Sequence, residues 1–394
     1  FAAATLGERF TFRKGTRVCF QLEVDFPGTT STKNAVVTDV VPAGTSYEAG
    51  SMTVVTAPGA GVAFNEAAAA AGTANPTWDL GDVAGSGLFV PPAQTLLVRF
   101  SVIVDAASTT GTVDITGNLM KFRSASTPGA ATSLRDQVDF GIAPPPPVTV
   151  LKGVYQVNGA PALGNDPNVD GVQVSEGDVA TFRVDVTNGG DAATGTDFSI
   201  NGVNVWDVLA PGITCSMVSS ISQVSTDPTS PAGTCTDPSD AGHPSFNGST
   251  TLSAITWVFR SGTAGDPERI PAGTSRMLTY DVTVPAATSV GTVFTDTAYI
   301  RSFNAFTDLT GVTATYYPAD NVDTTVPLDQ QDALAASDPS NVYLPSVTGS
   351  KAVVSSSITE TNNNGTNQVT NGETVTFRLS VVVPARTTVY NGAL

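Results

Sequence analysis

Two long stretches of this chain repeat one another, and a third begins the same pattern. Residues 16–44, 179–212 and 374–394 each open with an alternating apolar segment: TRVCFQLEVDF, VATFRVDVTN and TVTFRLSVVV. Repetition at this scale is typical of an array of similar domains, each packed on its own core. It argues against one large fold built around a single active site.

The later motifs of the two full copies match in order. PAQTLLVRFSVIV at residues 92–104 corresponds to PAGTSRMLTYDVTV at residues 271–284. Arg123 then aligns with Arg301, an offset of 178 residues that puts Asn118 at the place of Asp296. Asp39 in the first copy likewise corresponds to Asp207 in the second.

Alternation of apolar and polar residues predicts strands throughout. Val18, Phe20, Leu22 and Val24 share one face in the first copy, and Phe182, Val184 and Val186 share one in the second. Short strands between Gly, Pro, Asn and Asp turns indicate an all-β fold of tandem immunoglobulin-like (Greek-key) β-sandwich domains joined by short Pro-rich linkers. The one helical candidate, residues 61–76, is short, and we expect Trp78 and Trp257 to fill cores.

The repeats also predict domain boundaries. GIAPPPPVTV at residues 141–150 reads as a stiff spacer between domains, and a second boundary falls near residues 341–350. We expect a sandwich at 1–143 that lacks its first strand, a sandwich at 144–345 with an insertion at about 213–255, and the first strands of a third, incomplete repeat at 346–394. Two interpretations fit these incomplete copies: a window cut from a longer array, or chains that complete one another by strand donation.

Composition limits the function classes. Only 13% of residues are charged, and the net charge is −17. Nucleic-acid binding is therefore not expected, because phosphate contacts need clustered Lys and Arg. No apolar run approaches the ~18 residues of a membrane helix, and neither a signal peptide nor an initiator Met is present. We expect an extracellular, bacterial cell-surface segment without membrane insertion, whose anchor, if it has one, lies outside this sequence.

The three cysteines suit an oxidising compartment. Cys215 and Cys235 flank a Ser/Thr/Pro-rich stretch within one domain, which favours a local disulfide. Alternation points Cys19 away from the apolar face. It is either a free, partly buried thiol or a bridge to another chain.

Lysine is scarce, and two of the five lysines begin the leading strand of a repeat. Lys152 (VTVLKGVYQV) and Lys351 (VTGSKAVVSS) stand among small and apolar residues, where a charge must be paired or neutralised. The ordered set of a Lys-bearing first strand, GETVTFRLSV, a TD/WD-Pro-Ala-Gly turn, Trp…PAGTSRMLTYDVTV and a last strand with Asn or Asp resembles the DUF11-type and fimbrial isopeptide-forming Ig-like repeats of bacterial surface proteins.

That resemblance implies a cross-link between the first and last strands. Lys152 would be the nucleophile, Asp296 the acceptor and Asp207 the proton shuttle, with Asp39, Asn118 and Lys351 as partial equivalents in the other copies. Burial favours a neutral amine and protonated carboxyl groups, as amide formation requires. Such a reaction turns over once, so the resemblance implies a staple and not an enzyme. The alternatives are an ordinary or outward-facing Lys152–Asp296 pair, and Asp39 and Asp207 as turn caps.

A second motif suggests a metal. DPNVDG places Asp166, Asn168 and Asp170 at positions one, three and five of an EF-hand-like calcium loop. Position twelve is Gly177, not Glu, so a polar hairpin turn is the alternative. Calcium is the one cofactor candidate. His243, the only histidine, lies in the insertion, and we expect no catalytic role for it.

These observations predict a non-enzymatic, mechanically stable segment of a bacterial cell-surface or fimbria-like fibre. Its partners would be neighbouring copies of itself or adjacent repeats of the same chain. Two alternatives remain: an adhesin module that binds a host or matrix ligand through the 213–255 loop, and a surface-layer lattice protein.

Overall fold

The structure is a computed structural model of all 394 residues. It describes residues 10–26, 28, 32–58, 65–67, 77–79, 92–108, 112–125, 131–162, 169–190, 199–244, 246, 251–260, 267–306, 313–327, 331, 335–357 and 371–383.

The first domain is a sandwich of two sheets. One sheet has the order β2-β8-β4, with β5 also on β8, and the other has the order β1-β10-β9-β3-β7-β6. Inward residues of β2 alternate with exposed ones, as the sequence pattern predicts, and pack on β8 around Phe20 and Phe100. The strands are β1 (Thr11–Phe12), β2 (Arg17–Asp25), β3 (Lys33–Val40), β4 (Thr45–Tyr47), β5 (Thr53–Thr56), β6 (Asn65–Ala67), β7 (Thr77–Asp79), β8 (Thr95–Val104), β9 (Asp114–Ala125) and β10 (Ala131–Ile142).

The second domain repeats this plan with more strands. Its sheets have the orders β12-β11-β14-β19-β16 and β13-β22-β20-β15-β18-β17, with β21 also on β20. Trp257 lies fully buried in the core between them. The strands are β11 (Val148–Val157), β12 (Ala160–Pro161), β13 (Val172–Gln173), β14 (Val179–Asn188), β15 (Ile200–Val208), β16 (Val218–Ser219), β17 (Thr234–Thr236), β18 (Ala254–Val258), β19 (Thr274–Thr283), β20 (Val293–Phe306), β21 (Thr313–Tyr316) and β22 (Ser337–Tyr343), and the short 3-10 helix η2 spans Cys215–Met217.

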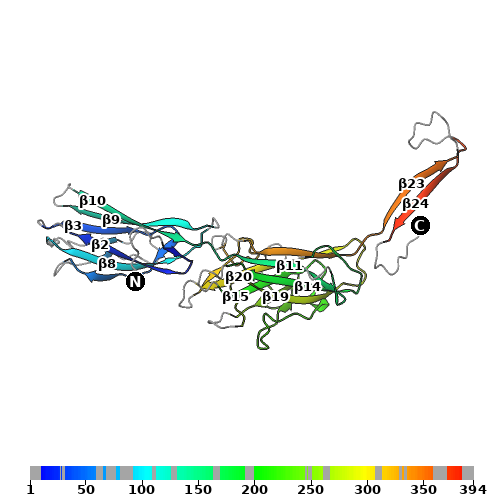
Figure 1. The fold of residues 1–394 in the computed structure, drawn as a ribbon, viewed down its shortest axis with the longest axis horizontal. Helices are drawn as coiled ribbons and strands as arrows, with labels where there is room; N and C mark the ends of the chain where they lie inside the picture. The colour runs from blue at the N-terminus through cyan, green and yellow to red at the C-terminus, as the bar shows by residue number, and fades with distance from the viewer. Residues whose placement is uncertain are drawn as a thin grey trace.

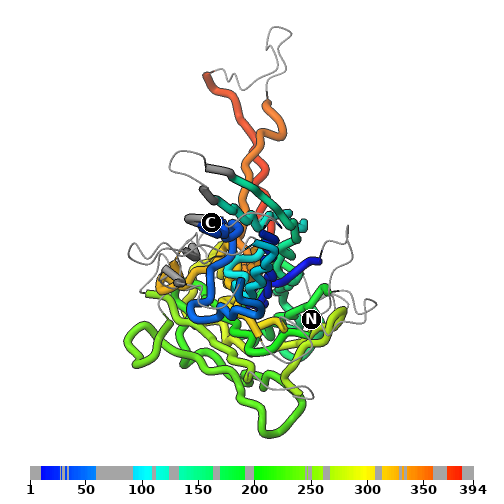
Figure 2. The backbone as a smooth tube through the Cα atoms, turned by 90° about the vertical axis from the view of Figure 1, so that its left-hand side faces the viewer, coloured from blue at the N-terminus to red at the C-terminus, as the bar shows by residue number. Residues whose placement is uncertain are grey.

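A third element extends away from the two sandwiches. Strands β23 (Thr348–Ser356) and β24 (Val375–Val382) form an antiparallel hairpin, which Figures 1 and 2 show in orange and red. Phe377 and Leu379 of β24 are exposed, because the described part of the hairpin packs on no second sheet.

These sheets confirm the predicted fold class: the chain is all-β and forms β-sandwich domains. The helical candidate at residues 61–76 is described only at Asn65–Ala67, which is strand β6 and pairs with β7. The Pro-rich run is shorter as a linker than its sequence indicates, because β10 continues to Ile142 and β11 begins at Val148. It does not hold the domains apart either. Arg13 Nη1 donates to the Phe306 carbonyl at 3.3 Å, and Ala107 packs on the second domain's core.

Candidate functional site

A lysine lies at the centre of the second sandwich. Lys152 belongs to β11, where its Cα partner is Val184 of β14, and its side chain is 0% exposed. Alternation along β11 turns this side chain inward together with Val150 and Val154. An ammonium group in such a place requires partners, because an unpaired buried charge costs several kcal/mol.

Two aspartates and a tyrosine from three other strands surround the Lys152 amine. Its Nζ lies 2.5 Å from Asp207 Oδ1 of β15, 2.8 Å from the Tyr280 hydroxyl of β19 and 3.7 Å from Asp296 Oδ2 of β20. The rings of Phe182 and Tyr280 also lie 5.1 and 5.4 Å from Nζ. The sequence-predicted Lys152, Asp207 and Asp296 therefore meet in one buried cluster.

The carboxyl group of Asp296 is held in place from both sides. Its Oδ1 accepts a hydrogen bond from the Ala210 amide at 2.8 Å, and its Oδ2 accepts one from the Tyr280 hydroxyl at 3.1 Å. Ala210 follows β15 in the WDVLAPG turn, so that turn fixes Asp207 and Asp296 relative to one another. Hydrogen bonds to both oxygens polarise a carbonyl carbon toward attack.

Burial governs the protonation of the cluster. Fully ionised, one ammonium and two carboxylates would leave a net negative charge out of contact with water, which is unfavourable. Desolvation raises the pKa of Asp207 to about 6, opposed by Lys152 and reinforced by Asp296. Burial also raises the pKa of the Tyr280 hydroxyl well above its ordinary value, so Tyr280 stays protonated. A proton on one carboxyl group makes the cluster neutral overall.

The backbone of β11 is anchored to the opposite sheet at the same residue. The Lys152 amide donates to Asp338 Oδ2 of β22 at 2.6 Å. Asp338 lies opposite Ala298 in the pairing of β20 with β22. This contact fixes the position of β11 along the neighbouring strand β22, and hence the position of Lys152.

The first domain contains counterparts of Asp207 and Asp296, but among the described residues it contains no counterpart of Lys152. Asp39 of β3 and Asn118 of β9 are 0% and 2% exposed, and Asn118 Nδ2 donates to Asp39 Oδ1 at 2.6 Å. Desolvation raises the pKa of Asp39 to about 7, against the lowering effect of the Asn118 hydrogen bond. The other oxygen, Asp39 Oδ2, is buried without a hydrogen-bond partner.

Sheet register places these residues in correspondence. Asp207 lies opposite Ala298, two residues from Asp296, and Asp39 lies opposite Met120, two residues from Asn118. Neither Asp39 nor Asp207 caps a turn, because both lie inside strands and are fully buried.

At Lys351 and Tyr280 the structure departs most from what the sequence predicted. Lys351 of β23 is exposed, with Nζ 4.0 Å from the centre of the Phe377 ring, and no carboxyl group of the described residues forms an ion pair with it. Tyr280 was not among the predicted site residues. The signal was present in TSRMLTYDVTV, where the hydroxyl of an inward tyrosine between Leu278 and Val282 needs a partner.

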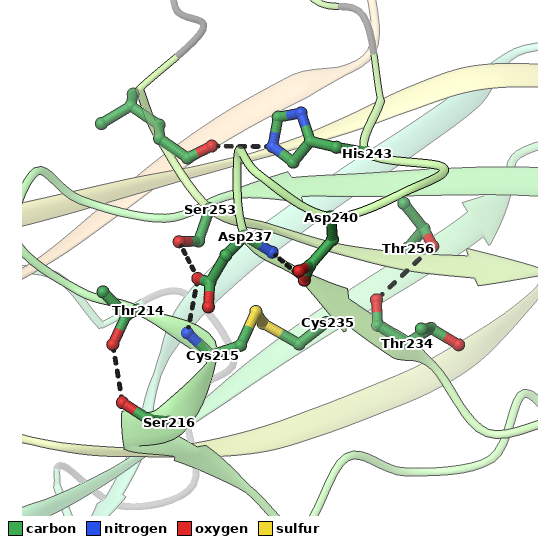
Figure 3. Close-up of a disulfide and its surroundings, with 11 residues drawn as sticks. Thr214, Cys215, Ser216, Thr234, Cys235, Asp237, Asp240, His243, Ser253 and Thr256 are labelled. Carbon is green, nitrogen blue, oxygen red and sulfur yellow. Dashed lines mark hydrogen bonds between the residues drawn. A yellow bond between two sulfur atoms is a disulfide. The ribbon is translucent and has the colours of Figure 1, made fainter.

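Cys215 and Cys235 form a disulfide that ties the edges of the two sheets together. The S–S distance is 2.01 Å, and Cys215 precedes β16 of one sheet whereas Cys235 lies on β17 of the other. In Figure 3, Asp237 accepts hydrogen bonds from the Cys215 amide and from Ser253 Oγ, at 2.9 and 2.6 Å. Cys19, the third cysteine, is free and exposed, not partly buried, because alternation along β2 turns it to solvent.

The calcium hypothesis falls mostly outside the described residues. Asp166 and Asn168 are not among them, and Asp170 is exposed just before β13. Within the described ranges, no three His, Cys, Asp or Glu side chains gather closely enough to hold a metal ion. His243 Nε2 donates one hydrogen bond, at 2.9 Å, to the Leu252 carbonyl. Among the residues that the structure describes, no helix is long and apolar enough to cross a membrane.

Known structures that are similar to this chain at low identity include a domain of an AgI/II polypeptide and two major pilins. The C-terminal domain of the AgI/II polypeptide BspA from Streptococcus agalactiae is 11% identical, with 78% of this chain and 93% of that chain covered and a TM-score of 0.32. A two-domain piece of the major pilin SpaD from Corynebacterium diphtheriae is 10% identical, with 84% and 96% covered and a TM-score of 0.26. The major pilin subunit BcpA of Bacillus cereus is 11% identical, with 85% and 68% covered and a TM-score of 0.24.

No protein-family model matches the sequence, and neither does any curated protein.

Proposed function

We propose that this chain is a load-bearing structural segment of a bacterial cell-surface protein or fibre, and that its second domain is stapled by an amide bond between Lys152 and Asp296. The observation that supports the proposal is the fully buried Lys152 amine in contact with Asp207, Asp296 and Tyr280. Stability alone does not explain a lysine at this position, because proteins in which apolar residues replace a buried ion pair are often as stable as the original or more stable.

The chemistry is a condensation without a cofactor. The neutral Lys152 amine attacks Cγ of protonated Asp296, so an Nζ–Cγ bond forms and the Cγ–Oδ2 bond breaks. Asp207 takes a proton from Nζ and delivers it to the departing Oδ2, which leaves as water. The Ala210 amide and the Tyr280 hydroxyl stabilise the charge that develops on the Asp296 oxygens. The second domain of each chain reacts once.

The staple would serve a mechanical role. It joins β11, the first strand of the domain, to β20, which pairs with the last strand, β22. A pulling force applied along the chain would pass through the amide bond and bypass the residues between Lys152 and Asp296. A fibre needs domains that resist extension in this way.

The alternative role of the 213–255 insertion as an adhesive loop has less support. Its described part contributes β16 and β17 to the edges of both sheets and contains the disulfide. It therefore forms part of the sandwich wall. Deleting it would test for ligand binding only if the sandwich still folded.

Intact and peptide mass spectrometry of the reduced, denatured chain tests the staple. We expect a loss of one water and a peptide containing Lys152 linked to the peptide containing Asp296. Asp296→Asn should lose one ammonia instead, and Asp207→Asn and Lys152→Met should lose nothing. Lys351→Ala is the matched control and should still lose water. An unmodified mass in the native chain would refute the staple.

A further inference from the structure

The first two domains differ strongly in charge. Residues 1–143 contain nine Lys or Arg and twelve Asp or Glu, whereas residues 144–345 contain six Lys or Arg and twenty-one Asp or Glu. The net charge of the chain, −17, therefore comes mainly from the second domain. Two copies of such a chain repel one another unless a basic surface of one copy meets the acidic domain of the other.

Three cations lie together on the outer face of the first domain. Phe122 of β9 points into the core, so its neighbours Lys121 and Arg123 point outward. Arg135 of β10 lies opposite Lys121 and therefore shares that face, and both arginines are exposed. We name Lys121, Arg123 and Arg135 the basic strip. Figure 1 shows β3, β9 and β10 side by side in this sheet.

The charges of the basic strip are not neutralised within the part of the chain that the structure describes. None of its three side chains forms an ion pair or a side-chain hydrogen bond with another described residue. Asp139, the next carboxylate along β10 on the same face, accepts a hydrogen bond from Gln137 Nε2 at 2.6 Å instead. Other arginines of the two domains pair with carboxylates of their own domain: Arg17, Arg183, Arg260 and Arg301.

Apolar side chains lie on the same outer face beside the basic strip. Val36 of β3 is opposite Arg123 and is half-buried, as is Leu119 of β9, two residues before Lys121. Ile115, on the same face of β9, is 51% exposed. An apolar centre with charged residues at its border is the usual composition of a protein–protein interface.

The basic strip lies toward one end of the pair of domains, and exposed carboxylates lie at the other. β10 runs from the basic strip to Ile142, which leads into the linker, so the basic strip is turned away from the second domain. In the second domain, Asn188 at the end of β14 lies opposite Val148, next to the linker. The exposed Glu176, just before β14, is therefore at the far end. A second copy can bring this surface to the basic strip.

We propose that the basic strip docks on the acidic second domain of another copy of this chain. The contact is heterologous, because it joins two different surfaces, so each copy can hold one neighbour through its basic strip and another through its second domain. The first domain of each copy then lies beside the second domain of the next, in a staggered row. This contact goes beyond the amide bond between Lys152 and Asp296 and does not depend on it.

Sedimentation of the full chain at several concentrations tests the contact. We expect native chains to associate in about 0.01 M salt and to separate in about 1 M salt, because screening shortens the reach of a charge from about 30 Å to about 3 Å. Arg123→Gln with Arg135→Gln should raise the dissociation constant at least about tenfold in low salt. Arg17→Gln with Arg99→Gln, on the opposite sheet, changes the net charge equally and should alter it less than about twofold. Urea unfolding checks that both variants fold.

Zero-length cross-linking identifies the partner surface. A carbodiimide joins a lysine amine to a carboxylate that touches it, and Lys121 is the lysine of the basic strip. In the dimer fraction we expect Lys121 of one copy linked to an Asp or Glu within residues 144–345 of the other, recognised by mixing chains of two isotopic masses. Lys351, exposed on β23, is the control lysine and should form no such link.

The outcomes separate this proposal from the staple. Lys152→Met, which cannot form the amide bond, should associate as the native chain does. Chains that stay monomeric in low salt, or that associate equally in low and high salt, would overturn the contact whether or not the staple forms. Links from Lys121 to carboxylates of residues 1–143 would overturn the second domain as the partner surface. Monomeric chains that bind polyphosphate through the basic strip would overturn the second copy as the partner.

Discussion

At the scale of single residues, the proposed staple depends on burial to turn an ordinary lysine and two aspartates into a reactive group. In water the amine would be protonated and the carboxyl groups ionised, and no amide would form. Inside the sandwich, the cost of desolvation falls on every ionised form at once, so the neutral amine and the protonated acids become accessible. The same argument applies to Asp39, which has no cation beside it among the described residues.

Asp39 predicts how the stability of the first domain depends on pH. Its pKa is raised to about 7 in the folded chain, against ~3.9 when unfolded. Between these values the folded state binds the extra proton, so stability falls as pH rises from about 4 to about 7 and is then constant. The difference is on the order of 4 kcal/mol at most.

Urea unfolding of the first domain at pH 5 and pH 8 measures this effect. The native chain should be less stable at pH 8, and Asp39→Asn should remove most of the difference. Equal pH dependence in the two proteins would contradict the protonated, buried Asp39.

Tyr280→Phe tests the hydroxyl at the cluster. The substitution deletes one hydrogen-bond partner of Lys152 and one of Asp296, so we expect slower amide formation and, in the Asp207→Asn background, a loss of about 1–2 kcal/mol. The rate is measured on freshly synthesised chain that has not yet reacted, as the fraction of molecules that have lost water at successive times after synthesis. Tyr299→Phe, outside the cluster, is the control and should react at the native rate.

The sequence was sufficient to predict the members of this cluster but not its full geometry. Lys152 stood out because it is a charged residue in an apolar pattern. The family resemblance pointed to Asp207 and Asp296, and the repeat offset paired Asp296 with Asn118. Tyr280 was missed because a tyrosine on an inward strand face usually indicates only packing. Asp338 was missed because its contact is with a backbone amide, which no side-chain pattern reports.

At the scale of secondary-structure elements, the disulfide closes the sandwich where backbone pairing cannot. Strands β16 and β17 are two and three residues long and lie at the edges of different sheets. Cys215–Cys235 links them across the domain edge. The Asp237 hydrogen bonds to Cys215 and Ser253 hold the same corner (Figure 3).

Removing the disulfide should destabilise the second domain. The bond closes a loop of 20 residues, for which the chain-entropy estimate is about 3 kcal/mol. We expect Cys215→Ser with Cys235→Ser to lower the free energy of unfolding by about that amount, measured by urea unfolding. Cys19→Ser is the control, because its thiol is exposed and unpaired, and it should change stability by less than about 0.5 kcal/mol. A double variant as stable as the native chain would show that the edge strands need no cross-link.

At the scale of the whole molecule, the described residues form two β-sandwiches followed by a β-hairpin. Alternation and repeat spacing were enough to predict this architecture, because both reflect local strand geometry. The contact between the first two domains was not predicted, since Pro-rich composition indicates stiffness but does not indicate what the flanking strands pack against. The same Pro-rich run therefore joins domains that touch through Arg13 and Ala107.

The contour length that the second domain releases in single-molecule pulling tests the proposed Lys152–Asp296 bond most directly. In single-molecule pulling, a bond between Lys152 and Asp296 would keep the residues between them from extending. At ~3.5 Å per residue, and with the Cys215–Cys235 disulfide reduced in every sample, the second domain would then release roughly 500 Å less contour length than it does in Lys152→Met or Asp207→Asn. The account predicts this shortfall in the native chain and in Lys351→Ala. Equal contour lengths in the native chain and the two cluster variants would contradict it.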